Sequence, residues 1–433
     1  MKKIKRQNTK TAMFAGATAL MALIPKTHAQ SSVDALLNKL EQKGVLTVDE
    51  ADQLKTENAT NSTADFNKAF SSKFSMPDWI TDYKLNGDFR GRFDDQTTDA
   101  SSLADRMRLR YRLRVGLAVD MKDNLEVGFR LGSGDSGNPL SNNQTFSGNA
   151  SKKTLYVDTA YGKWTPIHND DWMLTATFGK MNEPFEVSPM IFDPDYTPEG
   201  GALQSTFKLN DNQSFKFNDA AFILDEVSKS SRDPFLYGAQ AIWDSKWTPQ
   251  IGTSFGVAFY DIVNKENLLA TYDSNVGNTL VGGALVNNYN PIVLDGSVTY
   301  TLDSFPFYNG KFLIRFAAEY MNNPGADNDN EGYWAAITFG KSGKKGTWDI
   351  SYRYQRLEAD AWWDQVVDDD NIAFVNGGFA GGTGVKGHLV KINYSMTDAL
   401  TFTFTCYMND LINAAPGAKT DALHAMADIV WKF

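Results

Sequence analysis

The chain has 433 residues, of which 42 are basic and 52 acidic, and it contains a single cysteine, Cys406. The net charge of −10 argues against nucleic acid as a partner, because the phosphate backbone attracts cationic surfaces. One cysteine excludes an internal disulfide framework, so stability must come from a large core or from a closed sheet in lipid.

Residues 1–29 have the organisation of a secretory signal peptide. Basic residues precede an apolar run from Thr11 to Ile24, and Thr27-His28-Ala29 places small residues before a cleavage position. The run is shorter than the ~20 residues that a membrane helix needs. We expect cleavage after Ala29. Because residues 1–29 hold six basic and no acidic residues, the exported chain would carry a net charge of −16.

Residues 30–57 show helical periodicity instead. Apolar residues recur at helical spacing, at Val33, Leu36, Leu37 and Leu40. Thr47-Val48-Asp49-Glu50 resembles a capping box that opens a second short helix. We expect a periplasmic helical segment over 30–57, followed by a polar linker over 58–83. The segment would self-associate or, alternatively, contact peptidoglycan or a periplasmic partner.

From residue 84 to 433 the chain repeats segments of roughly ten residues that alternate apolar and polar side chains. One face of these segments is rich in aromatic residues and the other is polar, small or charged. A soluble sandwich also alternates, but with shorter strands and polar outward faces. The pattern therefore favours a transmembrane barrel with lipid outside and water inside.

The connections support the same fold. Short links alternate with long polar loops, which indicates short periplasmic turns, long outer loops and about sixteen strands with both ends in the periplasm. Six tryptophans fall beside the short links, as an interfacial aromatic girdle would require: Trp164, Trp172, Trp243, Trp247, Trp348 and Trp431. The alternative is that they pack in a soluble core. The expected fold class is an all-β, antiparallel transmembrane β-barrel over 84–433.

Three stretches of the chain resemble a family of porins from Gram-negative bacteria. They are Leu36–Thr47, the segment from Phe178 to Gly200 after the fifth strand, and the ending Ile429–Phe433. The resemblance implies a diffusion channel in the bacterial outer membrane, surrounded by lipid and lipopolysaccharide. It also implies a homotrimer and a C-terminal Phe433 that the barrel-insertion machinery reads.

Arginines on one strand would set ion selectivity. Period-2 spacing puts Arg106, Arg108, Arg110, Arg112 and Arg114 on one face. On the lipid side each would cost about 2–4 kcal/mol near the midplane, so we expect them to line the pore. Neighbouring strands extend the patch through Arg90, Arg92 and Arg130. A wall of arginine favours anions.

The alternative is that acidic residues neutralise these arginines. Candidates in the long loop are Asp193, Asp195 and Glu199, and candidates on adjacent strands are Asp88 and Glu126. Both interpretations can hold together, because a basic wall that faces an acidic loop produces a transverse field across a constriction. Such a field would favour small dipolar solutes.

Two acidic clusters and four histidines are the candidates for metal binding and catalysis. Residues 327–331 and 368–370 could bind Ca²⁺, but neither matches the spacing of a calcium loop. A solvated outer loop, in contact with divalent ions on lipopolysaccharide, is the better interpretation of both. No metal spacing or nucleophile motif accompanies the four histidines, and nothing positions Ser395 with His424. We therefore expect no cofactor, no metal and no enzymatic activity.

The leading functional hypothesis is a water-filled porin for passive diffusion of small hydrophilic solutes and ions. One alternative is a channel selective for an anion or substrate such as phosphate or an organic acid. Another is a plugged barrel that serves as an adhesin or a structural protein.

Overall fold

The computed structural model describes residues 77–268 and 277–433. The expected signal peptide, the helical segment over 30–57 and nearly all of the linker lie outside these residues. The first strand begins at Ile80, within the last residues of the expected linker. No helical segment of the described residues has the length and hydropathy that crossing a membrane as a helix requires.

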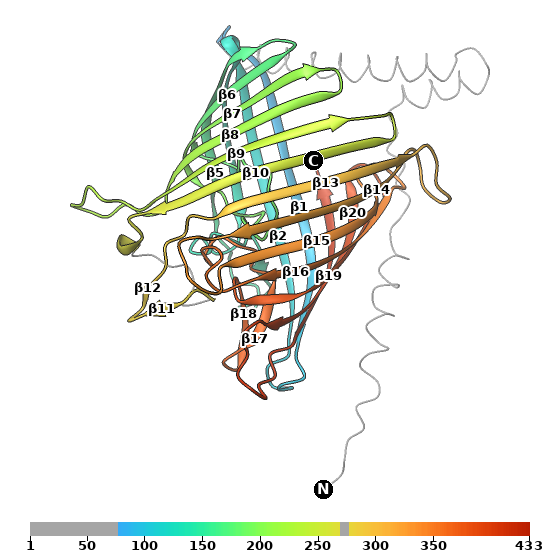
Figure 1. The fold of residues 1–433 in the computed structure, drawn as a ribbon. Helices are drawn as coiled ribbons and strands as arrows, with labels where there is room; N and C mark the ends of the chain where they lie inside the picture. Colours follow the sequence, from blue (N-terminus) through green and yellow to red (C-terminus); the bar gives the residue numbers. More distant parts are fainter. Residues whose placement is uncertain (1–76, 269–276) are drawn as a thin grey trace. The chain divides into compact units, whose positions relative to one another are not determined.

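Sixteen antiparallel strands form one closed barrel (Figure 1). Each strand pairs with its two neighbours in the chain, and β1 closes the ring by pairing with both β2 and β21. The fold class expected from the sequence is therefore confirmed. The barrel strands are β1 (Ile80–Thr97), β2 (Arg106–Met121), β3 (Leu125–Ser133), β5 (Leu155–His168), β6 (Trp172–Lys180), β7 (Glu199–Asn210), β8 (Gln213–Ile223), β9 (Phe235–Lys246), β10 (Ile251–Val263), β13 (Ile292–Leu302), β14 (Phe312–Asn322), β15 (Glu331–Gly340), β16 (Trp348–Leu357), β19 (Val385–Ser395), β20 (Leu400–Leu411) and β21 (Ala422–Lys432).

Small elements lie in the connections. The two-residue strand β4 (Gln144–Thr145) pairs with β2. Two hairpins, β11 (Leu280–Val281) with β12 (Ala284–Leu285) and β17 (Ile372–Val375) with β18 (Gly378–Gly381), belong to the longest loops. Two connections contain a single 3₁₀ turn, namely η1 (Lys122–Asn124) and η2 (Lys265–Asn267).

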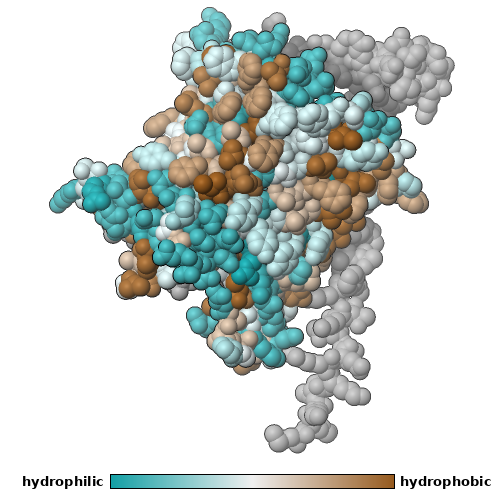
Figure 2. Space-filling model, viewed as in Figure 1, coloured by the Kyte–Doolittle hydropathy of each residue, from teal (hydrophilic) through white to brown (hydrophobic). Residues whose placement is uncertain are grey.

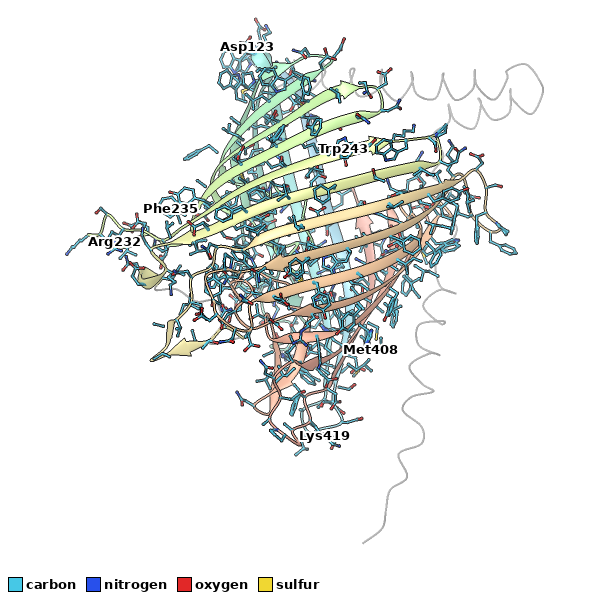
Figure 3. The ribbon with its side chains drawn as sticks, viewed as in Figure 1. Asp123, Arg232, Phe235, Trp243, Met408 and Lys419 are labelled. Carbon is cyan, nitrogen blue, oxygen red and sulfur yellow. The ribbon has the colours of Figure 1, made fainter. Side chains whose placement is uncertain are left out.

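Short turns gather at one end of the barrel and long loops at the other. Figure 3 shows Asp123 and Trp243 towards the short-turn end, whereas Arg232 and Lys419 lie in loops at the opposite end. In the tight turn between β2 and β3, Asp123 and Asn124 adopt positive φ values of 62° and 58°. Asp and Asn tolerate this left-handed conformation better than most residues, which suits them to a turn of this length.

The outward face of the barrel is apolar. Large hydrophobic side chains that alternate along the strands are exposed, for example Leu109 on β2, Phe255 on β10 and Phe316 on β14. Figure 2 shows apolar residues gathered over the strands and hydrophilic residues over the loops. Exposure of this much apolar surface is favourable only in contact with lipid.

All six tryptophans singled out in the sequence lie in or beside the short turns. Trp243 and Trp247 pack edge to face, with ring centroids 5.7 Å apart, at the turn between β9 and β10. Trp348, at the start of β16, donates from Nε1 to the carbonyl oxygen of Phe307 at 3.0 Å. An indole that packs its ring on apolar neighbours and satisfies its N–H suits the boundary between lipid and water.

Two inward-folded loops build an apolar core inside the long-loop half of the barrel. Phe185 and Phe192 from the loop over 181–198 pack edge to face on Tyr260 of β10. Trp362, from the loop over 358–384, is fully buried and donates from Nε1 to the carbonyl oxygen of Ile191 at 2.9 Å. The two loops are therefore held against each other and against the inward side chains of the wall.

The inside–outside assignment predicts opposite effects for two adjacent residues of β10. Phe255 is 53% exposed on the outward face, and Ser254 lines the lumen. We expect Phe255→Arg to lower the free energy of unfolding by about 2 kcal/mol or more, because a guanidinium in lipid is poorly solvated. Ser254→Arg should cost much less. Urea unfolding from lipid vesicles measures both, and equal losses would contradict the assignment.

Candidate functional site in the barrel lumen

The register between β1 and β2 puts charged side chains in direct opposition inside the barrel. Asp88 lies opposite Arg114 and Asp94 opposite Arg108, which are favourable cross-strand pairs. Between them, however, Arg90 lies opposite Arg112 and Arg92 opposite Arg110. Like charges in opposition destabilise a sheet, so this arginine wall requires carboxylates from elsewhere in the fold.

At one end of the wall, Asp88 and Asp195 neutralise two arginines together. Arg112 donates to Asp88 Oδ2 from Nε and Nη2 at 3.0 and 2.8 Å, and its Nη1 reaches Asp195 Oδ1 at 2.9 Å. Arg114 donates from Nε to Asp88 at 2.7 Å and lies 3.4 Å from Asp195. Asp195 thereby anchors the loop over 181–198 to β2. These are charge-assisted hydrogen bonds, which are stronger than neutral ones.

At the other end, Asp94 occupies the centre of a second cluster. It accepts both Nη2 bonds of Arg108 at 3.0 Å and lies 3.4 Å from Nη1 of Arg110. His424 Nε2 of β21 is 3.5 Å from Asp94, and its Nδ1 lies 2.9 Å from the backbone oxygen of Asp370. Three strands therefore meet at this carboxylate, and His424 connects it to the loop over 358–384.

Barrel closure supplies the partner of Arg92. Asp428 on β21 lies directly opposite Arg92 in the register with β1. It accepts a bidentate pair from Nε and Nη2 at 2.8 and 3.0 Å, while Nη1 reaches Asp370 at 3.0 Å. The side chain of Arg92 is 6% exposed. A guanidinium so deeply enclosed needs partners of this quality, because a buried unpaired charge is costly.

The remaining arginines differ in their partners. Arg130 pairs with Asp158 of β5. Arg90 donates from Nη2 to Asn143 Oδ1 at 2.6 Å and lies 4.0 Å from Asp428. Arg106, the first residue of β2, is exposed and forms no ion pair with a described residue. Apart from Arg106, the arginine wall is thus an ion-paired surface and not a row of free cations.

Of the acidic residues proposed from the sequence, Asp195 and Asp88 contact the arginines, whereas Asp193, Glu199 and Glu126 do not. Asp193 accepts the backbone N–H groups of Asp195 and Asp369, at 2.7 and 3.3 Å. Glu199 lies in β7, exposed, 3.2 Å from Lys180. Glu126 accepts from Lys163 and Tyr161, each at 2.9 Å.

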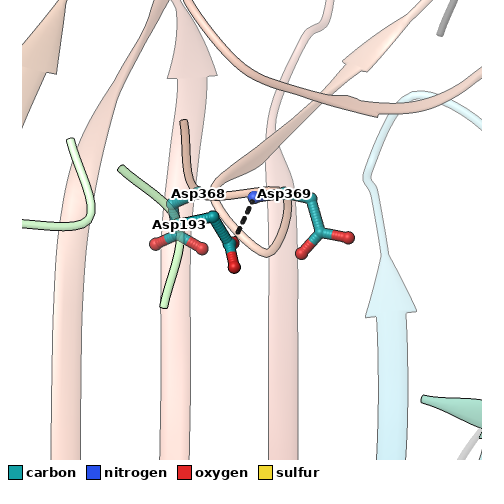
Figure 4. Close-up of side chains that lie close together, drawn as sticks. All are labelled: Asp193, Asp368 and Asp369. Carbon is teal, nitrogen blue, oxygen red and sulfur yellow. Dashed lines mark hydrogen bonds between the residues drawn. The ribbon is translucent and has the colours of Figure 1, made fainter. Parts of the chain in front are cut away.

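Residues 368–370 lie in the lumen and not in a solvated outer loop, so that interpretation of the sequence was wrong. Asp368 is buried and accepts the hydroxyl of Tyr407 at 2.8 Å. Oxygens of Asp193, Asp368 and Asp369 lie within 4.8 Å of one another (Figure 4). Burial and mutual repulsion raise the pKa of Asp193 and of Asp369 well above the usual value. Protonation relieves this repulsion, so the cluster can persist without a metal ion.

The two loop acids that meet the arginine wall have the opposite shift. Burial alone would raise the pKa of Asp195, but the charges of Arg112, Arg90 and Arg114 outweigh it and hold the pKa below the usual range. For Asp370, burial is likewise outweighed, chiefly by Arg92, and the pKa falls to about 2. Both carboxylates are therefore ionised at neutral pH, and both loops are held to the wall by charge.

Two glycines let the loop over 181–198 leave the wall. Gly179 on β6 and Gly200 on β7 lie opposite each other in the register, with φ values of 124° and 156°. A Cβ on Gly179 would lie 2.4 Å from the carbonyl oxygen of Ala160, and one on Gly200 would lie 2.1 Å from that of Ala221. Only glycine fits at both positions, where the chain turns into the lumen.

Below the inward loops, towards the short turns, the lumen opens into a polar vestibule. This cavity has a volume of about 960 Å³ and extends along the inward faces of β7–β10, β13–β16 and β19. Its lining combines hydroxyl, amide and charged side chains, among them Ser254, Thr299, Arg315, Asp349 and Lys391. The vestibule therefore provides a surface that water and polar solutes can wet.

The sequence matches the family described as "Putative porin" over residues 98–280 and 292–433. The chain belongs to this porin family. Family and fold together point to a channel of an outer membrane and away from an enzyme. A search of curated proteins found no match.

Solved porin structures resemble the barrel. Pseudomonas putida OprB has a TM-score of 0.52 at 10% identity, covering 81% of this chain and 94% of its own. Salmonella typhi OmpF, in complex with daunomycin, has a TM-score of 0.47 at 10% identity over 81% and 97%. A Rhodopseudomonas blastica porin variant has a TM-score of 0.41 at 10% identity over 81% and 100%. The likeness to OprB supports the fold alone.

Sequence reasoning missed four acids that pair with this porin's arginines: Asp94, Asp158, Asp370 and Asp428. Asp94 is in phase with Arg90 and Arg92, so alternation along β1 could have revealed it. Asp428 is in phase with the inward residues of the last strand, and closure of a barrel makes that strand the neighbour of the first. Asp370 left no such signal, because it belongs to a loop.

The buried carboxyl of Glu183 leads us to predict that the loop over 181–198, which carries Asp195, loosens at alkaline pH. Its Oε1 accepts the N–H of Phe185 at 3.0 Å, but Oε2 is buried without a hydrogen-bond partner among the described residues. Burial raises the pKa of Glu183 to about 8, with partial relief from the Phe185 N–H. The contribution of this carboxyl to the folded loop is fully present below its ordinary pKa of 4.5, and it is lost progressively as pH rises until the loss is complete above about 8.

The amides of residues 181–198 should therefore be less protected from hydrogen exchange at pH 9.5 than at pH 7, after correction for intrinsic exchange rates. The two pH values lie on either side of the Glu183 pKa of about 8. Glu183→Gln should abolish the difference. Glu199→Gln, at an exposed carboxylate of the same region, should keep it. Equal protection of the native loop at both pH values would contradict the prediction that ionisation of Glu183 loosens it.

Proposed function

We propose that this porin allows small hydrophilic solutes to diffuse passively across a bacterial outer membrane. The observation that carries the proposal is the polar vestibule of about 960 Å³ inside a barrel whose outward face is apolar. A barrel stabilised only by its packed interior would not need such a cavity. Passage is driven by the solute gradient.

The pairing of the arginine wall bears on selectivity. Because Asp88, Asp94, Asp195, Asp370 and Asp428 neutralise most of its charge, the wall does not present the isolated cations of a strongly anion-selective pore. It instead places fixed positive and negative groups side by side across a narrow space. We infer a preference for small dipolar solutes over apolar ones, with weak selectivity between anions and cations.

The biological setting is part of the proposal. The exported chain would lose residues 1–29, insert into the outer membrane in contact with lipopolysaccharide and assemble as a homotrimer. Phe433 extends the pairing of β21 with β1, since its N–H and carbonyl group bond Gly87 at 3.1 and 2.8 Å. The insertion machinery would read this terminal residue, and residues 30–57 would make a periplasmic contact.

A plugged structural barrel is the competing interpretation, because the loops over 181–198 and 358–384 build an apolar core within the lumen. Swelling of liposomes that contain the full exported chain separates the two. A diffusion channel should admit uncharged sugars at rates that fall steeply with molecular mass. Native-like barrels that admit no sugar of any size would overturn the proposal.

Neutralising one loop acid should shift ion selectivity towards anions. Asp195→Asn leaves Arg112 paired with Asp88 but removes one negative charge from the lumen. We expect the chloride-to-potassium permeability ratio to rise about twofold, since a charge close to the ion path acts with little screening. Reversal potentials in a KCl gradient measure it. Glu199→Gln, outside the arginine wall, is the matched control, and an equal shift in both variants would argue against a constriction at Asp195.

A further inference from the structure

Two inward-facing cations, separate from the arginine wall, have no carboxylate partner. Arg353 on β16 and Lys391 on β19 form no ion pair with any residue of 77–268 or 277–433. Arg353 Nε is buried and has no hydrogen-bond partner within those ranges. In the same lumen, every arginine of the wall except Arg106 has a carboxylate within 4.0 Å. Other vestibule cations, such as Arg315, Lys208 and Lys246, also form no ion pair with a described residue. What distinguishes Arg353 and Lys391 is that they lie together on two neighbouring strands.

The strand register brings the two cations together. Lys391 lies opposite Ser351, and Arg353 is two residues further along β16 on the same inward face, opposite Leu389. Diagonal positions of this kind lie ~7–8 Å apart at the backbone, within reach of long side chains. Hydroxyl groups flank the pair, because Thr405 of β20 lies opposite Lys391 on its other side.

The nearest carboxylates already have donors of their own. Asp349 accepts from Asn393 Nδ2 at 2.7 Å and from the backbone N–H of Ser342 at 2.9 Å. Asp368 accepts from the Tyr407 hydroxyl and from the backbone N–H of Asp370. The charge of Arg353 acts on Asp368, but neither acid forms an ion pair with Arg353 or Lys391, so both cations can still accept a solute anion.

The position along the lumen is open to solutes. Lys391 and Ser351 line the vestibule, and the side chain of Lys391 is exposed to it. Arg353 lies one layer closer to the inward loops, just below the buried Gln355. A solute in the vestibule would therefore meet the two cations where the vestibule approaches those loops.

We propose that Arg353 and Lys391 form a binding subsite for small oxyanions, meaning phosphate or carboxylate groups. A guanidinium offers parallel N–H donors that match two oxygens of such a group, and an ammonium with adjacent hydroxyls completes the contact. This deepens the proposed diffusion function, on which it rests, by naming a solute class. Binding is weak and saturable, because a conducting site must release what it binds.

Two other lysines of the barrel have carboxylate partners. Lys216 on β8 has two carboxylate partners, Glu186 at 2.8 Å and Asp244 at 3.0 Å. Lys163 on β5 is likewise paired with Glu126 at 2.9 Å. These paired lysines provide a control in which the same amount of positive charge is removed from the lumen without touching the subsite.

The test measures anion binding separately from conduction. Isothermal titration of the full exported chain in detergent, with inorganic phosphate and with acetate against a chloride background, should show saturable binding. The variant R353Q/K391Q should bind at least tenfold more weakly, and K163Q/K216Q should bind as the native chain does. The charge-conserving R353K/K391R should retain much of the affinity, which guards against a loss caused by misfolding.

Each outcome has one meaning for the subsite. Binding by the native chain that is unaffected in R353Q/K391Q, or absent for both anions, overturns it. Response to phosphate alone or to acetate alone narrows the class to that group. The same proteins in planar bilayers then test the channel itself. Anion binding with no conductance would overturn the diffusion function and leave the subsite standing. Conductance without anion binding would overturn the subsite and leave the diffusion function standing.

Discussion

The structure depends on one constraint, which is that no backbone N–H or carbonyl group can remain unpaired in lipid. Closing β1 onto β21 meets it, because every barrel strand then has two hydrogen-bonded neighbours. Closure also fixes the two faces of the sheet, since side chains alternate with a period of two residues. The apolar surface and the polar lumen are both consequences of that closure.

Closure creates the electrostatic problem that the inward loops resolve. The register between β1 and β2 sets Arg90 against Arg112 and Arg92 against Arg110. Carboxylates then come from the last strand, through Asp428, and from two loops, through Asp195 and Asp370. The contacts of Asp195 and Asp370 also hold the loops inside the barrel. The same ion pairs therefore neutralise the wall and narrow the lumen.

The lumen consequently has two electrostatic regions. Along the arginine wall, charges are paired and enclosed, and they act mainly as fixed dipoles. Elsewhere in the lumen, Lys216 is paired with Glu186 and Asp244, whereas Arg353 and Lys391 form no ion pair with a described residue. A porin built this way can discriminate weakly by overall charge and still interact with particular solutes at one place on its wall.

Alternation of apolar and polar residues was enough to predict the barrel and the inward side of the arginines, because alternation is a local pattern that does not depend on which strands are neighbours. The lengths of the links between strands likewise indicated sixteen strands and which end carries the long loops. The pairing of particular acids with particular arginines could not be predicted in this way, because it depends on contacts between distant parts of the chain. Asp428 reaches Arg92 through closure over more than three hundred residues, and Asp195 and Asp370 reach the wall through loops whose course no periodicity describes. For the same reason Asp193 and Glu199, close to Asp195 in the chain, have other partners.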